Sequence, residues 1–134
     1  MNNKSLLTIA IFLAVLCNVA FAKDKGIAVE INDVQKFAQG SIGEARYGGG
    51  KEEDIGCGVS MSDTGLLWAF CNATAANGDY VICTTDSESF VDAIAMINST
   101  SYIRFFWNED AAGPFGLNSC ATINVSNQSQ YLWK

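Results

Sequence analysis

The sequence contains no histidine among its 134 residues. Without an imidazole, the chain cannot build a Ser-His-Asp or Cys-His catalytic group, and it lacks the commonest metal ligand in proteins. These absences exclude most hydrolase mechanisms, and no other catalytic or cofactor motif stands out. We therefore expect no cofactor and no resident metal, and we favour a role other than enzyme.

Basic residues are also scarce, with eight Lys and Arg against fourteen Asp and Glu. Nucleic acids and anionic lipid surfaces are bound through clusters of Lys and Arg, and this chain has no such cluster. The acidic composition therefore predicts no nucleic-acid partner. It leaves a protein or a glycan as the class of ligand.

The first 22 residues have the pattern of a cleaved signal peptide. Lys4 precedes an apolar run from Leu6 to Leu16, and Ala20 and Ala22 have signal-peptidase spacing. The run is short for a bilayer span, which needs about 20 residues. We expect cleavage after residue 22, a secreted or periplasmic location and no membrane association afterwards. The remaining 112 residues form one domain.

Four cysteines remain in that domain, namely Cys57, Cys71, Cys83 and Cys120. Structural zinc sites use Cys-x-x-Cys pairs or histidine, and the chain has neither. An even number of cysteines in a small exported domain predicts a disulfide framework. We favour Cys57–Cys71 with Cys83–Cys120, and the alternative is Cys71–Cys83 with Cys57–Cys120.

Residues 55–134 show the clearest secondary-structure pattern. Three strands are predicted over residues 55–61, 66–74 and 79–85, with a hairpin turn at Asn77-Gly78. Phe90, Ala93, Ile94 and Ile97 have helical spacing within residues 85–98, and strands over 101–108 and 120–127 follow. The prediction is an α+β fold with a mainly antiparallel five-stranded sheet, in the order β-β-β-α-β-β, and one helix on one face.

The secondary structure of residues 23–54 is less clearly predicted. They contain a short alternating stretch over 27–33, one possible helical turn over 34–39, and a glycine-rich, charged stretch over 40–54. Glycine with charge is typical of a loop. We expect a partly flexible N-terminal segment that contributes little to the core of the single domain.

The candidate binding residues lie around the strand 101–108 and the loop after it. Most aromatic residues should furnish the core, but a sheet with one helix leaves a face open for a ligand or partner. Trp107, Phe115, Tyr131 and Trp133 are the aromatic candidates for that surface. The adjacent acidic residues Glu109 and Asp110 are either ligand-binding groups, a carboxylate pair for glycoside hydrolysis, or solvated loop charges.

Parts of residues 55–134 resemble a pattern in small exported bacterial proteins of unknown function. The segments that carry the resemblance are "CNATAANG" to "CTTD", "SYIRFFWN" and "SCATINVSN". The matching positions are Cys71, Ala73, Gly78, Cys83, Thr85, Ser101, Tyr102, Ile103, Phe105, Trp107, Cys120 and Val125. The resemblance implies a shared fold and transfers no activity.

These observations together predict a small exported, disulfide-stabilised binding or interaction protein. An enzyme inhibitor or toxin-like secreted effector is the alternative, with residues 108–116 as a presented loop. A glycan hydrolase based on Glu109 and Asp110 is the third hypothesis.

Overall fold

Seven strands form a single mixed sheet in the computed structural model, which describes residues 26–48 and 52–127. Their order across the sheet is β1-β2-β6-β7-β5-β4-β3. The strands are β1 (Glu30–Asn32), β2 (Phe37–Ser41), β3 (Asp54–Met61), β4 (Leu67–Thr74), β5 (Tyr80–Thr85), β6 (Ser101–Ala112) and β7 (Asn118–Asn127). The helices are α2 (Ile42–Tyr47) and α3 (Glu88–Ala95), and a short 3-10 turn, η1, spans Pro114–Gly116. The predicted signal peptide and the candidates Tyr131 and Trp133 lie outside the described residues.

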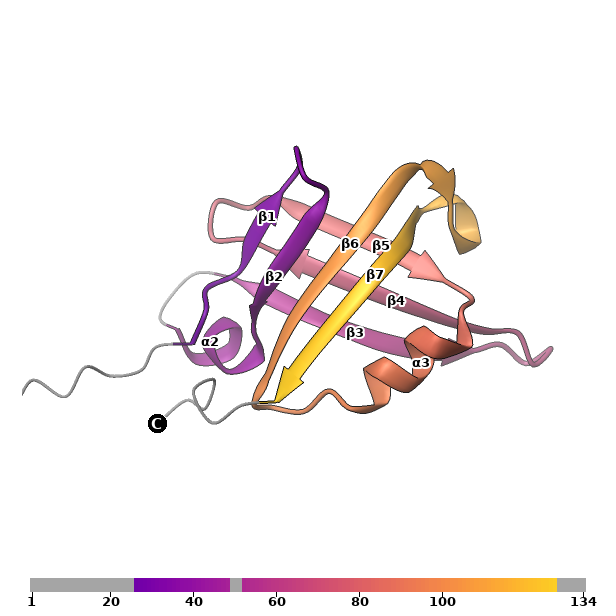
Figure 1. Cartoon of the computed structure of the whole chain (residues 1–134), viewed down its shortest axis with the longest axis horizontal. Coiled ribbons are helices and arrows are strands. Elements are labelled where there is room, and N and C mark those ends of the chain that lie inside the picture. Colours follow the sequence, from indigo (N-terminus) through magenta and orange to yellow (C-terminus); the bar gives the residue numbers. More distant parts are fainter. Residues whose placement is uncertain (1–25, 49–51, 128–134) are drawn as a thin grey trace, which may run out of the picture.

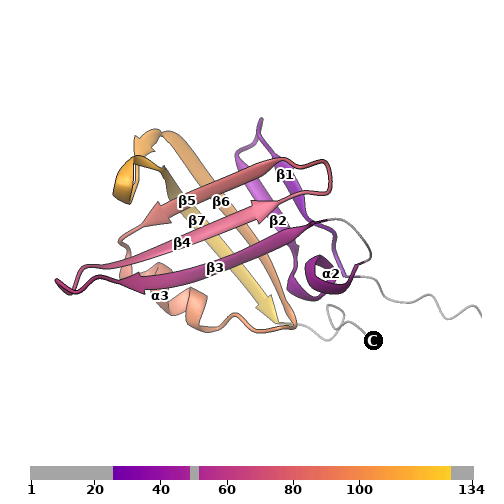
Figure 2. The ribbon, with the colours of Figure 1, turned by 180° about the vertical axis from the view of Figure 1, so that it is seen from behind.

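The sheet is strongly bent, so that its two halves cross and enclose the core. Strands β1, β2, β6 and β7 run steeply in Figure 1, whereas β3, β4 and β5 run across them, and Figure 2 shows the same crossing from behind. A Cβ atom added to Gly40 of β2 would lie 3.4 Å from the side chain of Ile55 in β3. Residues of the two outer regions of the sheet therefore meet, and α2 and α3 close the two ends between the halves.

The predicted five-stranded sheet with one helix on one face is wrong, because residues 26–48 and 52–127 contain seven strands and two helices. The difference lies in residues 26–48, which form β1, β2 and α2. Phe37 and Ala38 are consecutive and both buried, so β2 lacks the alternation that identifies a strand. The sequence predicts a loop around Gly40, whereas this residue lies within β2. A Cβ atom at this position would come within 3.1 Å of the Val29 side chain, so close packing favours glycine there.

One strand pair, between β5 and β7, is parallel. β6, which follows α3 in the chain, pairs antiparallel with β2 and β7, and β7 is the strand beside β5. The parallel pair has only two ladder positions, Cys83↔Asn118 and Thr84↔Ser119. Because this overlap is short, residues 80–82 at the start of β5 have no neighbouring strand on the side where β7 lies.

The core lies between the two halves of the bent sheet. Ile103, Phe105 and Trp107 alternate inward from β6, and α3 adds Phe90 and Ile94, two of the residues whose spacing predicted that helix. At about 25 cal/mol for each Å² of apolar surface buried, large side chains of this kind dominate the stability of a small domain.

Two disulfides join adjacent strands, which confirms the predicted framework. Cys57 is bonded to Cys71 and Cys83 to Cys120, with Cα–Cα distances of 4.0 and 5.0 Å. These are the pairs favoured from the sequence. In the alternative pairing, Cys57 and Cys120 would be three strand spacings apart, or roughly 14 Å, whereas a disulfide needs Cα atoms within about 7 Å.

Candidate functional site

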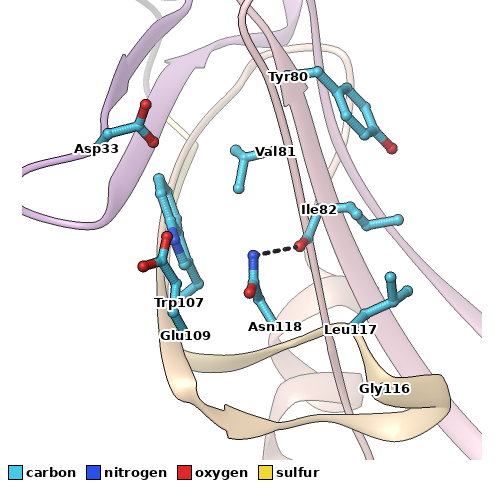
Figure 3. Close-up of a pocket in the computed structure, with 9 residues that line it drawn as sticks. All are labelled: Asp33, Tyr80, Val81, Ile82, Trp107, Glu109, Gly116, Leu117 and Asn118. Carbon is cyan, nitrogen blue, oxygen red and sulfur yellow. Dashed lines mark hydrogen bonds between the residues drawn. The ribbon is translucent and has the colours of Figure 1, made fainter.

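A hollow of about 310 Å³ opens between β5, β6, the start of β7 and the turn that joins β1 to β2. Figure 3 shows that its polar side chains gather on one side of β5, whereas the side chains of Tyr80 and Ile82 point to the other side. The residues that line it are Asp33, Tyr80, Val81, Ile82, Trp107, Glu109, Gly116, Leu117 and Asn118. We call this hollow the β5-edge pocket.

The β5-edge pocket exists because β5 and β7 separate upstream of Cys83. Residues 80–82 have no β7 partner, so the backbone edge of β5 faces the pocket there. Asn118 reaches across this gap, and its Nδ2 atom donates a long hydrogen bond of 3.5 Å to the carbonyl oxygen of Ile82. The second N–H and the carbonyl oxygen of the same amide remain able to bond to a ligand.

Trp107 forms the inner wall of the pocket. The residue is only 4% exposed, and its buried Nε1 atom makes no hydrogen bond of ordinary length and angle among the described residues, although it lies near enough to the Glu109 carboxylate to act on it as a donor. Its backbone N–H donates to the carbonyl oxygen of Lys36 at 3.0 Å, which ties the β1–β2 turn to β6.

Glu109 lies beside the Trp107 indole and is held by a cation from the β1–β2 turn. The Nζ atom of Lys36 donates to Glu109 Oε1 at 2.7 Å. This hydrogen bond is the main reason that the pKa of Glu109 falls below its ordinary value of 4.5, although desolvation opposes it. The charge of Lys36 and, as the smallest contribution, hydrogen bonding from the Trp107 indole N–H lower the pKa further. Glu109 is therefore an ionised hydrogen-bond acceptor throughout the neutral range.

Asp33 supplies a second carboxylate to the pocket, from the turn between β1 and β2 (Figure 3). It is exposed, and it makes no hydrogen bond or ion pair within residues 26–48 and 52–127. Lys36 neutralises one of the two carboxylates, so the pocket keeps a net negative charge. In the part of the chain that the structure describes, no three acidic or cysteine side chains are placed to hold a metal ion.

Four of the six candidate binding residues lie among the described residues, and the structure brings two of those four together. Trp107 and Glu109 both line the β5-edge pocket, whereas Asp110 and Phe115 do not. Asp110 is exposed on the far part of β6. Phe115 is 66% exposed and packs edge-on against Trp68, with ring centroids 4.9 Å apart.

The segment after Asn108 is fastened to β5 rather than extended away from the sheet. Thr84 donates a hydrogen bond from its Oγ1 atom to the carbonyl oxygen of Pro114 at 2.8 Å, and Gly113 bonds to Leu117 at 2.7 Å. A Cβ atom on Gly113 would lie 2.6 Å from the carbonyl oxygen of Thr84, so the contact is tight. This geometry gives no support to a freely presented inhibitory loop.

Three pocket residues, Asp33, Tyr80 and Asn118, were not candidates in the sequence. They come from three separate segments, and Asp33 belongs to a turn whose strands were not recognised. The only local signal was the "IND" end of β1, where Asn32 accepts a hydrogen bond at Oδ1 from the backbone of Gln35 at 2.9 Å. That pattern indicates a turn, not a binding residue.

No family model, no curated protein and no solved structure matches the chain. The resemblance to small exported bacterial proteins therefore stays a prediction. Among the described residues, no helix has the length and apolar character needed to cross a membrane.

Proposed function

We propose that the chain is a small exported binding protein that takes its ligand into the β5-edge pocket. The polar groups that converge on the open edge of β5 carry this proposal, because residues 80–82 have no β7 partner and the side chains of Asp33 and Asn118 face the same hollow. The carboxylate of Glu109 and the free amide groups of Asn118 add hydrogen-bonding capacity on the same side of β5. Export is supported by the signal-like first 22 residues and by the paired cysteines.

The disulfides favour binding because they pre-organise the pocket. Cys83 follows Ile82 on β5, and Cys120 lies two residues after Asn118 on β7, so the Cys83–Cys120 bond fixes the two walls next to the gap. A rigid site loses little conformational entropy when a ligand binds.

The electrostatics of Glu109 argue against glycoside hydrolysis at this site. A general acid needs a raised pKa so that it carries a proton near neutrality, whereas Lys36 lowers the pKa of Glu109. The second carboxylate of the hypothesis, Asp110, does not line the pocket. We therefore propose binding without turnover.

The proposal is tested by nuclear magnetic resonance of the oxidised, ¹⁵N-labelled protein with a library of small polar compounds. Binding compounds should shift the amide signals of Asp33, Val81 and Asn118 together with the indole signal of Trp107. Compounds that bind only around Trp68 and Phe115, with the pocket signals unmoved, would refute the proposal.

A further inference from the structure

We infer that the outer face of β3, β4 and β5 docks a basic protein partner, and that a hollow beside Trp68 receives an arginine side chain of that partner. The outer face is the side of these strands that points away from the core, and it is turned toward the viewer in Figure 2. Apart from the turn η1 at the end of β5, no helix or strand of the described residues lies over it. This hollow shares no lining residue with the β5-edge pocket, so the inference goes beyond the proposed function.

Aromatic side chains gather on this outer face. Trp68 and Phe70 are half-buried, and they alternate along β4 with residues that have no exposed surface, so both rings point away from the core. The Phe115 ring, from η1, packs against Trp68 and extends the aromatic surface. Tyr80 of β5 is 60% exposed on the same face. Exposed rings that lie together in this way are typical of a surface that another molecule covers.

The backbone of Phe115 is strained. Its φ angle is 65°, in the left-handed region that a large side chain rarely adopts. The hydrogen bond from Thr84 to Pro114 fixes the turn in place, yet the Phe115 ring stays largely exposed and gains little from burial. Strained residues that the fold holds in place are concentrated at functional sites. The strain therefore points to a contact that Phe115 makes with another molecule.

The hollow beside Trp68 has a volume of about 370 Å³, and its charged group is a carboxylate. Asp86, directly after β5, lines the hollow together with Trp68 and residues 112–114. The Asp86 side chain is exposed and makes no hydrogen bond or ion pair with another residue of the described ranges. The hollow therefore combines an aromatic ring with an unpaired negative charge.

An arginine side chain matches this combination better than other groups. Its planar guanidinium group stacks on aromatic rings and donates paired N–H groups to a carboxylate. Its methylene stem can pack on the exposed Leu66, which also lines the hollow. A lysine ammonium group supplies the charge but has no flat face. An acidic group would be repelled by Asp86, and an apolar one would bury that carboxylate without a partner.

The charge distribution favours a basic protein over a second copy of this chain. Residues 52–103, which include β3, β4, β5 and α3, contain no Lys or Arg. Their eight acidic residues are Glu52, Glu53, Asp54, Asp63, Asp79, Asp86, Glu88 and Asp92. This half of the molecule therefore attracts a positively charged surface. A second copy would bring the same acidic half, while its Lys36 is paired with Glu109 and its Arg104 lies 4.1 Å from the centre of the Phe37 ring.

The test is a titration of the oxidised, ¹⁵N-labelled protein with short peptides, followed by nuclear magnetic resonance. The probes are a capped peptide of Gly-Arg repeats and the matching Gly-Lys and Gly-Glu peptides. We expect the arginine peptide to shift the Trp68 indole signal and the amide signals of Asp86 and Phe115 saturably. The lysine peptide should bind about threefold more weakly, because it loses the stacking on the rings. The glutamate peptide should not bind.

Three variants separate the hollow from the general charge of the molecule. Asp86→Asn removes the carboxylate from the hollow and should weaken binding of the arginine peptide about fivefold. Asp92→Asn is the matched control, because it removes the same charge from an exposed position on α3 outside the hollow, and it should change the affinity less than about twofold. Phe115→Gly deletes the ring at a position whose φ angle suits glycine, so it should weaken binding while the chain still folds. Equal weakening by Asp86→Asn and Asp92→Asn would overturn the assignment of the hollow.

The remaining outcomes distinguish this inference from the proposed function. If the arginine peptide shifts the signals of Asp33 and Trp107 instead, it binds in the β5-edge pocket, which supports the proposed function and overturns this inference. If the outer-face signals move with protein concentration in the absence of peptide, the face pairs two copies of the chain and the inference is also overturned. If no peptide moves the signals of Trp68 and Asp86, the inference fails, whereas the compound library still tests the β5-edge pocket independently.

Discussion

Cys71 lies directly opposite two cysteines, Cys57 on β3 and Cys83 on β5, yet it is bonded only to Cys57. Cys57, Cys71 and Cys83 form one row across β3, β4 and β5, and Cys83 is bonded in turn to Cys120 on β7. The two disulfides therefore clamp four neighbouring strands, and each closes a loop of different length.

Removing the two bonds separately should have unequal effects on stability. Chain-entropy arguments give about 3 kcal/mol for the bond with sequence separation 14, Cys57–Cys71, and about 4 kcal/mol for the one with separation 37, Cys83–Cys120. We expect a C83A/C120A variant to be less stable than a C57A/C71A variant in urea denaturation. The reverse order would show that native-state packing of Cys57 and Cys71 outweighs the loop entropy.

The ion pair between Lys36 and Glu109 predicts a specific dependence on pH. The folded-state pKa of Glu109 lies below its ordinary value of 4.5, so the stabilisation is present above about that pH. It is lost as the pH falls through the folded-state pKa. The effect is small, since the pair is exposed and screened by solvent.

Carbon-detected titration of the Glu109 carboxyl group checks this. The midpoint should lie below 4.5 in the unmodified protein and move upward in a Lys36→Met variant, because the main cause of the shift is removed. An unchanged midpoint in that variant would mean that Lys36 does not hold Glu109 in solution.

Two glycines of β3 should respond differently to replacement by alanine. A Cβ atom on Gly58 would come within 2.6 Å of the Phe70 ring, whereas one on Gly56 meets nothing within 4 Å. The Phe70 ring would have to lift away, with Trp68 packed beside it at 5.6 Å. We expect Gly58→Ala to lower the free energy of unfolding by about 1–2 kcal/mol.

Gly56→Ala is the matched control for that substitution, on the same strand and the same face. It should be neutral or slightly stabilising, because alanine reduces the entropy of the unfolded chain. Thermal unfolding of both variants gives the comparison, and equal destabilisation would contradict the contact between Gly58 and Phe70.

Substitutions at Trp107 should separate the contribution of its aromatic ring from that of its N–H group. Trp107→Phe keeps an aromatic ring in the core and removes the weak interaction of the indole N–H with Glu109. We expect a loss of about 1 kcal/mol or less in the free energy of unfolding, compared with about 3–5 kcal/mol for Trp107→Ala. Equal losses in urea denaturation would show that the aromatic ring contributes little to the stability of the core.

The sequence predicted the features that depend on local pattern. The hairpin turn at Asn77-Gly78 between β4 and β5, the helical spacing of Phe90 and Ile94 in α3, and the disulfide framework are all present in the structure. The short overlap of β5 with β7, which no local pattern signals, is what brings Cys83 and Cys120 together.

The sequence could not predict the features that arise from long-range packing. β2 is buried without alternation, and Gly40 signals close approach rather than a loop, so the N-terminal strands were missed. The β5-edge pocket depends on those strands, because Asp33 and Lys36 reach it from their turn. Only Trp107 and Glu109, which lie two apart on one strand, were within reach of sequence reasoning.

The two-position overlap between β5 and β7 also determines how the molecule bears mechanical load. The half-sheet of β3, β4 and β5 is connected to the other half by very few interstrand hydrogen bonds at this seam, and the Cys83–Cys120 bond crosses it. In the oxidising environment that we propose for this protein, force applied between the two halves is carried there by a covalent link.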